Sequence, residues 1–163
     1  MSEFQAFAGL GVKAATAAAE PLGLGSVGDD LCLLPEDHEA FLRFQAPKRP
    51  QYSLVSSLDG LGLLRGDLKG LLAPEDREKD LKGQFPGHAI LDRGRLTGRW
   101  EFDTAAGTIA WASFVPRDKA LEKAIHEMEV FVREDLGDAR SFGLDSPKSR
   151  APRIEALRAI AGG

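Results

Sequence analysis

An alternating run of side chains at residues 95–102 limits the possible folds of this chain more than any other feature of its sequence. Four mostly apolar residues occupy every second position: Leu96, Gly98, Trp100 and Phe102. Polar or charged residues occupy the positions between them: Arg95, Thr97, Arg99 and Glu101. Successive side chains of a β-strand point to opposite faces, so the run predicts a strand with one apolar and one polar face. We expect Trp100 in the core, and Gly98 where a neighbouring chain approaches closely.

Two further strands are expected beside this one. Residues 88–91 and 108–114 carry the apolar side chains that partner strands need. The turn residues Arg93-Gly94 and Ala105-Ala106-Gly107 separate the three segments. Turns this short connect antiparallel strands, so the three segments predict an antiparallel sheet.

The part of the chain before residue 46 has helical periodicity. Residues 2–10 and 12–20 predict two short helices joined by a glycine turn, which is typical of a helix-turn-helix. Residues 24–34 then predict a small hairpin, and residues 37–44 predict another helix. This is the order of elements in a winged helix that lacks its first helix.

The centre of the chain is less regular. Residues 46–50 contain two prolines and predict a linker. Residues 52–58 are a further candidate strand, whereas residues 61–72 are apolar but interrupted by glycines and fit no single element type. Residues 74–82 are highly charged and are expected to be exposed.

A long helix is expected toward the C-terminus, at residues 118–136. Its apolar positions form one stripe: Leu121, Ile125, Met128 and Val132. A basic loop at residues 146–150 leads to a short last helix at residues 152–161. The chain therefore predicts an α+β fold, with a partial winged helix at residues 1–46. A small antiparallel β-barrel or bent sheet with C-terminal helices is expected at residues 47–163.

Composition narrows the classes of partner. The net charge of −4 over 163 residues argues against coating nucleic acid by bulk charge, although local basic clusters can still contact it. The single cysteine, Cys32, cannot form an internal disulfide or a cysteine-based zinc site, and we expect it to be a small buried residue. No stretch approaches the roughly 18 apolar residues of a membrane span, and residues 1–10 lack the basic start of a secretory signal. We therefore expect a cytoplasmic protein without a membrane partner.

We find no catalytic or metal-binding motif in the sequence. His38, His88 and His126 do not have the spacing of metal ligands. The chain contains no Gly-x-Ser-x-Gly sequence, and the glycines of residues 61–72 lack the lysine and hydroxyl of a phosphate-binding loop. The sequence thus predicts no catalytic residues, no metal ion and no cofactor.

Four segments follow one another in an order known from one protein family. They are residues 3–11, 27–35, 56–59 and 88–100. The last segment contains Asp92-Arg93-Gly94-Arg95, then Gly98 and Trp100. In these motifs the chain resembles the winged-helix DNA glycosylases that unhook interstrand crosslinks, over roughly residues 3 to 135. The resemblance implies tandem winged helices before a small β-barrel, in a fold that cradles duplex DNA.

The catalytic signature of that family is absent from this chain. It consists of a glutamine, any residue, and then glutamine or aspartate, and it lies in an earlier winged helix. The residues two positions after Gln5, Gln45, Gln51 and Gln84 are, in that order, Phe7, Pro47, Ser53 and Pro86. Leu58 also replaces the aromatic residue that the family has before Asp59. The resemblance therefore implies a non-catalytic module, related to the rear part of these DNA repair enzymes. It would be either a stand-alone relative without the active site or a part of a longer protein whose chemistry lies elsewhere.

The leading hypothesis is a module that binds duplex DNA without sequence preference. The residues expected to contact DNA are Lys13, Thr16, Arg93, Arg95, Arg99, Lys148, Arg150 and Arg153. Arginine suits phosphate because its planar guanidinium offers several donors. The alternative is a protein-interaction or regulatory module that kept the fold without DNA binding. A third alternative is an enzyme with an unrecognised pocket.

Overall fold

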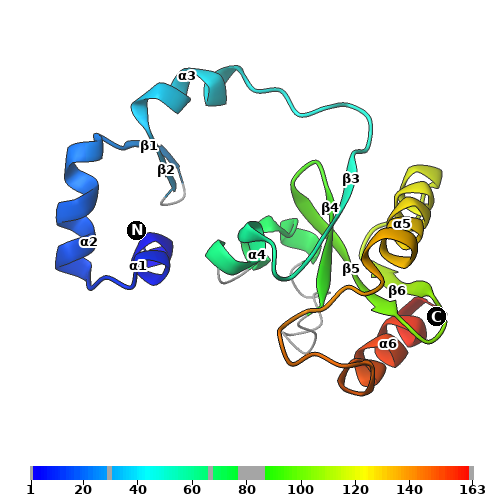
Figure 1. The fold of residues 1–163 in the computed structure, drawn as a ribbon. Helices are drawn as coiled ribbons and strands as arrows, with labels where there is room; N and C mark the ends of the chain where they lie inside the picture. The colour runs from blue at the N-terminus through cyan, green and yellow to red at the C-terminus, as the bar shows by residue number, and fades with distance from the viewer. Residues whose placement is uncertain (1, 29–30, 66–67, 77–86, 162–163) are drawn as a thin grey trace. The chain divides into compact units, whose positions relative to one another are not determined.

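The computed structural model describes residues 2–28, 31–65, 68–76 and 87–161 of the chain. It divides into two compact units, Met1–Ala46 with Leu64–Gly66, and Pro47–Leu63 with Asp67–Gly163. The described residues form an α+β structure with six α-helices and two antiparallel sheets (Figure 1).

The first unit begins with the two short helices that the sequence predicts, α1 (Ser2–Ala8) and α2 (Val12–Ala19). A 3-10 turn (Glu20–Leu22) follows and ends at Gly23, whose φ of 59° is in the left-handed region that glycine adopts readily. Strands β1 (Gly25–Gly28) and β2 (Leu31–Leu33) then form the expected hairpin, and α3 (Pro35–Arg43) completes the unit.

Cys32 is exposed, so the expectation that it is buried is wrong. It lies in the three-residue strand β2, opposite Ser26 on β1. Ser26 is exposed as well. The apolar run around Cys32 therefore forms a strand of a small two-stranded sheet rather than part of a core.

The second unit is built on an antiparallel sheet of four strands, in the order β3-β4-β5-β6. The strands are β3 (Tyr52–Val55), β4 (His88–Asp92), β5 (Arg95–Asp103) and β6 (Thr108–Ser113). The predicted strands and hairpins are thus confirmed. Strands β3 and β6 are the two edges, so within the described residues the sheet is open and does not close into a barrel.

A β-bulge in β5 changes the predicted face of Leu96. Ile90 pairs with Gly98, but the next residue of β4, Leu91, pairs with Leu96, so Thr97 is an extra residue on β5. The extra residue turns Leu96 to the opposite face from Trp100. Leu96 packs in a cluster with Leu72, Ala89 and Leu91, and the prediction that it shares a face with Trp100 is wrong.

Gly98 is placed where only glycine fits. A Cβ atom at this position would overlap the carbonyl oxygen of Ala112 on β6. It would also lie 3.1 Å from Cδ1 of Ile90 on β4. The predicted close approach of a neighbouring chain at Gly98 is therefore confirmed.

Helix α5 (Lys119–Phe131) covers the face of the sheet that carries Trp100. Asp118 caps the helix, because its Oδ1 accepts a hydrogen bond of 2.8 Å from the backbone N–H of Leu121. The predicted apolar stripe packs on Trp100 and Phe102. The helix continues as a π-helical turn (Val132–Leu136) and ends at Gly137, which has a φ of 74°.

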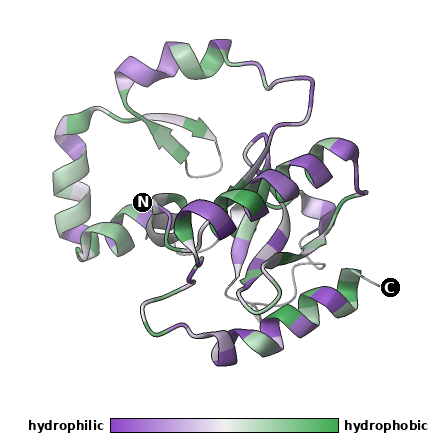
Figure 2. Cartoon of the chain, turned by 45° about the vertical axis from the view of Figure 1, so that its right-hand side comes forward, coloured by the Kyte–Doolittle hydropathy of each residue, from purple (hydrophilic) through white to green (hydrophobic). Residues whose placement is uncertain are grey.

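Helix α6 (Pro147–Ala161) covers the other face of the sheet. It is longer than the predicted helix at residues 152–161, because the segment expected to be a basic loop forms its first turns. Its apolar side chains Ile154 and Leu157 pack on Ala110 and Ala112 of β6. Figure 2 shows that this helix, which leads to the C-terminus, carries both hydrophilic and hydrophobic residues. Thr97 and Glu101 of the polar positions of β5 are buried, whereas Arg99 is half-buried and Arg95 is exposed.

The segment between β3 and β4 contains short helical elements. These are α4 (Gly60–Arg65) and two 3-10 turns, Lys69–Leu71 and Pro74–Asp76. Asp76 is buried, which differs from the predicted exposure of residues 74–82. Residues 77–82 of that prediction lie outside the described residues.

Candidate nucleic-acid interface

The turn between β4 and β5 fastens the linker that precedes β3. Arg93 and Gly94 form a two-residue turn in which both have positive φ, 50° and 81°, as a type I′ turn requires. The Arg93 guanidinium donates from Nη1 to the carbonyl oxygens of Pro47 and Lys48, over 3.3 and 3.5 Å. The backbone N–H of Arg93 donates to the carbonyl of Gln51 over 3.2 Å. The linker and the turn are therefore one local structure, although about 45 residues separate them in the sequence.

Asp92 orients the side chain of Arg93. The Arg93 Nη2 and Nε atoms donate to Asp92 Oδ2 over 2.7 and 3.0 Å, and Asp92 Oδ1 accepts from the backbone N–H of Gln51 over 2.8 Å. Burial alone would raise the pKa of the Asp92 carboxyl, but the hydrogen bonds from Arg93 and Gln51 outweigh it and lower that pKa. Arg93 thus mainly holds the linker in place through hydrogen bonds, and its charge is balanced by Asp92.

Three exposed basic residues lie where the linker meets the turn, and we call them the basic turn: Lys48, Arg49 and Arg95. Lys48 and Arg49 lie beside the carbonyls that Arg93 holds, and Arg95 follows Gly94 on the other side of the turn. The structure shows no hydrogen bond or ion pair for their side chains within its described part. Asp92 is the nearby acid, and it is already paired with Arg93. Within the described ranges of the chain, the basic turn therefore presents positive side chains to solvent without an ion-pair partner.

The sequence predicted Arg95 in this site but interpreted Lys48 and Arg49 only as part of a linker. Their contribution depends on contacts between residues 47–51 and 92–93, which no local pattern shows. Two adjacent basic residues between prolines were the available signal.

The other predicted contact residues are spread over the two units. Lys13 and Thr16 are exposed on α2 of the first unit, where the Thr16 hydroxyl donates to the carbonyl of Val12 over 2.9 Å. In the second unit, Lys148 is exposed on the first turn of α6. Arg99 is half-buried on the face of β5 that carries Glu101.

Arg150 is buried and the side chain of Arg153 is only 12% exposed, in contrast to the exposed basic patch that the sequence predicted for them. The Arg150 side chain is completely buried, and its Nη1 donates to Oδ1 of Asp138 over 2.7 Å. Arg153 donates from Nε to Glu101 Oε1 over 2.7 Å and from Nη2 to Asp145 Oδ1 over 2.9 Å. Both arginines hold α6 to the sheet and to the loop before it, so neither guanidinium faces solvent where a phosphate could bind.

Glu101 lies at the centre of this ionic network. Its Oε1 accepts hydrogen bonds from Arg153 and from the hydroxyl of Ser141, whereas its buried Oε2 has no hydrogen-bond partner among the residues that are described. Burial raises the pKa of Glu101, and the hydrogen bond from Arg153 only partly opposes that change.

His88 is a second buried polar group that the sequence did not distinguish. The backbone N–H of Ser57 donates to its Nδ1 over 3.0 Å, so Nδ1 is unprotonated. Its Nε2 is therefore the protonated nitrogen and donates to the carbonyl of Ala139 over 3.3 Å. The ring lies against Trp100 with 4.3 Å between centroids. Burial lowers the pKa of His88 to about 4, so the imidazole is neutral at neutral pH.

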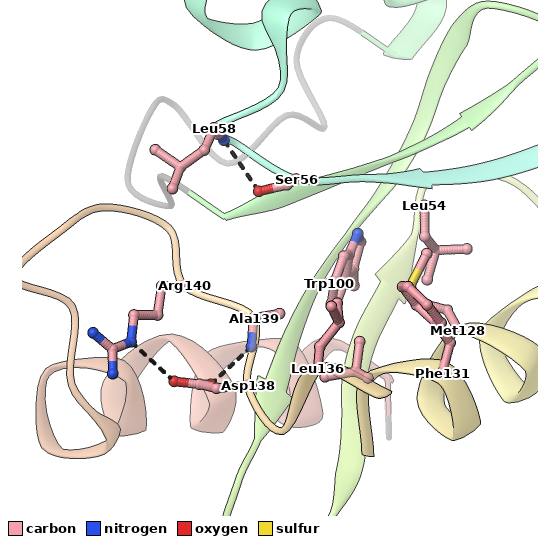
Figure 3. A pocket seen from close by; sticks show the side chains of 11 residues that line it. Leu54, Ser56, Leu58, Trp100, Met128, Phe131, Leu136, Asp138, Ala139 and Arg140 are labelled. Carbon is pink, nitrogen blue, oxygen red and sulfur yellow. Dashed lines mark hydrogen bonds and ion pairs between the residues drawn. The ribbon is translucent and has the colours of Figure 1, made fainter. Parts of the chain in front are cut away.

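An apolar hollow of about 540 Å³ lies between α5, the end of β3 and the segment after the π-helical turn (Figure 3). Its apolar lining includes Leu58, Phe131 and Leu136, and Trp100 forms part of its wall. Arg140 and Asp138 lie at one side of it, where the Arg140 Nε donates to Asp138 Oδ2 over 3.3 Å. The hollow can accept an apolar side chain or ligand.

No group of three or more His, Cys, Asp or Glu side chains within ranges 2–28, 31–65, 68–76 and 87–161 is placed to hold a metal ion. None of the helices in the same ranges is both long and apolar enough to cross a membrane.

Comparison with known proteins found no matching family model, no matching curated protein and no matching solved structure. Function is therefore argued from the residues and their geometry.

Proposed function

We propose that this chain binds duplex DNA through the phosphate backbone, without sequence preference and without excising bases. The basic turn is the observation that supports this proposal. One of its three residues, Arg95, lies in the segment, residues 88–100, that resembles the barrel hairpin of the winged-helix DNA glycosylases. The chain would be a relative of the rear part of those enzymes that acts in DNA repair by holding DNA.

The chemistry of the basic turn suits phosphate better than base edges. Arginine presents a planar set of donors and lysine a mobile point charge, and both pair with phosphate oxygens. The linker and the turn hold the backbone from which Lys48, Arg49 and Arg95 project, so little backbone ordering is needed on binding. The net charge of −4 opposes attraction of DNA by bulk charge, so binding has to depend on local basic sites such as this one.

The first unit supports the same function with its order of elements. Two helices and a hairpin, α1 to β2, follow one another as in a winged helix, and α2 exposes Lys13 and Thr16. We keep Lys13, Thr16, Arg95, Arg99 and Lys148 as proposed contacts. Arg150 is completely buried and Arg153 is paired with Glu101 and Asp145, so neither is a proposed contact. Arg93 acts by holding the linker.

Fluorescence anisotropy of a labelled duplex tests the role of the basic turn. The variant Lys48→Ala with Arg95→Ala removes two exposed charges there. Lys119→Ala with Lys123→Ala is the matched control, because it removes two exposed charges from α5. If each side chain contacts one phosphate, the basic-turn variant lowers the slope of log affinity against log salt by about 1.8, at about 0.9 per contact.

The control should retain the slope of the unsubstituted protein. Equal slopes for both variants would contradict the assignment of this site. Release of a base from alkylated or crosslinked duplex by the purified chain would contradict the proposed lack of catalysis.

A protein-interaction module is the second candidate, and the apolar hollow favours it. Apolar surfaces at solvent-accessible sites commonly mark protein contacts. Leu58, Phe131 and Leu136 line the hollow and are each about half exposed. Absence of DNA binding even at low salt would favour this function.

A further inference from the structure

The loop between α5 and α6 presents two apolar side chains to solvent, in the orange segment of Figure 1. Leu144 is 91% exposed and Phe142 is 40% exposed, with Gly143 between them. We call residues 142–144 the apolar tip. Exposed apolar side chains of this size contribute little to folding, because burial is what makes them stabilising.

The residues on both sides of the apolar tip are buried and fixed. Ser141 and Asp145 are almost completely buried, and the backbone N–H of Ser141 donates to Asp145 Oδ2 over 3.0 Å. The N–H of Asp145 donates to the carbonyl of Phe142 over 3.0 Å, which closes the loop into a turn. The hydrogen bonds of Ser141 and Asp145, the residues before and after the tip, thus fix its backbone.

These ends are in turn anchored to the sheet and to α6. The Ser141 hydroxyl donates to Glu101 on β5, and the Ser141 carbonyl accepts from the Ser57 hydroxyl over 3.0 Å. Asp145 is paired with Arg153 and lies 3.3 Å from Nε of Arg150. Charged groups are costly to bury, and here several of them fix a loop whose exposed tip carries only Phe142, Gly143 and Leu144.

Exposed basic side chains flank the tip on both sides. Arg140 precedes it and has a side chain that is 60% exposed, and Lys148 follows it on the first turn of α6. The acids nearest in sequence are both paired: Asp138 with the buried Arg150 and, over 3.3 Å, with Arg140 itself, and Asp145 with Arg153. Two apolar side chains between two cationic ones are complementary to a partner with an apolar interior and anionic groups on its surface.

We propose that the apolar tip is a wedge that inserts Leu144 and Phe142 between base steps of duplex DNA, while Arg140 and Lys148 contact the flanking phosphates. This inference rests on the proposed DNA binding and adds to it a second contact and a deformation of the duplex. Leucine and phenylalanine are among the residues that proteins insert into the minor groove to unstack and kink DNA. A fixed tip suits this role, since a mobile loop would have to be ordered on insertion.

Two measurements on one labelled duplex distinguish insertion of the apolar tip from binding without insertion. Anisotropy reports binding, and 2-aminopurine at the centre of the duplex reports unstacking by a rise in fluorescence. The unsubstituted chain should give both signals. Phe142→Ala with Leu144→Ala should still bind at saturating concentration but lose most of the 2-aminopurine signal. Leu144→Met should retain it, because methionine is also a wedge residue.

The basic-turn variant is the complementary control, because it weakens binding but should restore the full 2-aminopurine signal once the duplex is saturated. Chemical denaturation checks that the tip variant has an unchanged unfolding midpoint. Binding without any rise in 2-aminopurine fluorescence would overturn the wedge and leave the proposed function intact. No binding at low salt would overturn the proposed function. Tip-dependent sedimentation with phosphatidylserine vesicles, without a signal from the duplex, would show instead that the tip inserts into membranes.

Discussion

Arg153 on α6 donates from Nε to Oε1 of Glu101 on β5 over 2.7 Å, in the interior between the helix and the sheet. The Glu101 side chain is fully buried, and the Arg153 side chain is nearly so. Because Glu101 is paired with an arginine of α6, this helix can cover the part of β5 that carries the carboxylate. The pair also supports both ends of the apolar tip. Glu101 accepts a hydrogen bond from the Ser141 hydroxyl, and the Nη2 atom of Arg153 donates to Asp145.

Arg153→Ala should therefore destabilise the protein by about 3–5 kcal/mol, because it leaves Glu101 buried and uncompensated. Arg158→Ala is the matched control on the same helix. Its partner is Asp103, but its side chain is 51% exposed, so its loss should cost at most about 1 kcal/mol. Urea denaturation of the two variants measures both changes. Equal losses in the free energy of unfolding would show that the buried pair stabilises the protein no more than the exposed one.

Trp100→Ala should destabilise by about 3–5 kcal/mol, the range for removing a buried aromatic side chain. Trp100 is almost completely buried, packs in the core under α5, and donates from its indole N–H to the carbonyl of Ala89 over 3.2 Å. Leu144→Ala is the control, since Leu144 is on the exposed tip. A change near zero for Trp100→Ala in the same denaturation experiment would contradict its place in the core.

Most of the strands and longer helices could be predicted from the sequence because each has a local cause, whereas α4 and the first turns of α6 were not. The alternation at residues 95–102 gives β5, and the apolar stripe of residues 121–132 gives α5. The turns follow from Arg93-Gly94 and from Gly107. Such signals depend only on neighbours in the chain.

The arrangement of the elements could not be predicted in the same way. The bulge at Thr97 follows from pairing with β4, and it reverses the face of Leu96. The alternation in β5 does not show that α6 covers Glu101, which is possible because Arg153 supplies the partner for this buried carboxylate. Lys48 and Arg49 join the candidate site only because Arg93 holds carbonyls of the linker.

Protonation of His88 should destabilise the fold below neutral pH. Its pKa in the folded protein is about 4, below the ordinary value of 6.5, because burial disfavours the charged ring. The unfolded chain therefore binds a proton at higher pH than the folded protein does. Stability from neutral His88 is fully present above about pH 6.5 and is lost as the pH falls toward 4, by roughly 3 kcal/mol.

NMR of the imidazole nitrogens measures this group directly. The spectrum should show a neutral ring protonated on Nε2 from pH 7 to about pH 5. Titration with an ordinary midpoint near 6.5 would contradict its burial. The raised pKa of Glu101 acts on stability in the opposite direction, so His88→Gln should be compared with the unsubstituted protein over the same pH range.

Tyr52 should ionise at unusually high pH. Burial and then the hydrogen bond of 3.1 Å from its hydroxyl to Asp118 Oδ2 raise its pKa from 10 to about 12. Since it is the single tyrosine of the chain, ultraviolet absorbance follows its ionisation without overlap from another tyrosine. Asp118→Asn should bring the pKa closer to 10 while the amide oxygen still caps α5. An unchanged midpoint in that variant would show that Asp118 does not act on the phenol.

Salt dependence of duplex binding by the unsubstituted chain tests the central claim most directly. If Lys48, Arg49 and Arg95 each contact a phosphate, log affinity should fall linearly with log salt, with a slope of about −2.7 or steeper. Duplexes of unrelated sequence should give the same affinities and slopes, because phosphate contacts carry no sequence information. Anisotropy that stays constant on adding protein to a labelled duplex, even at the lowest salt concentration, would contradict the account.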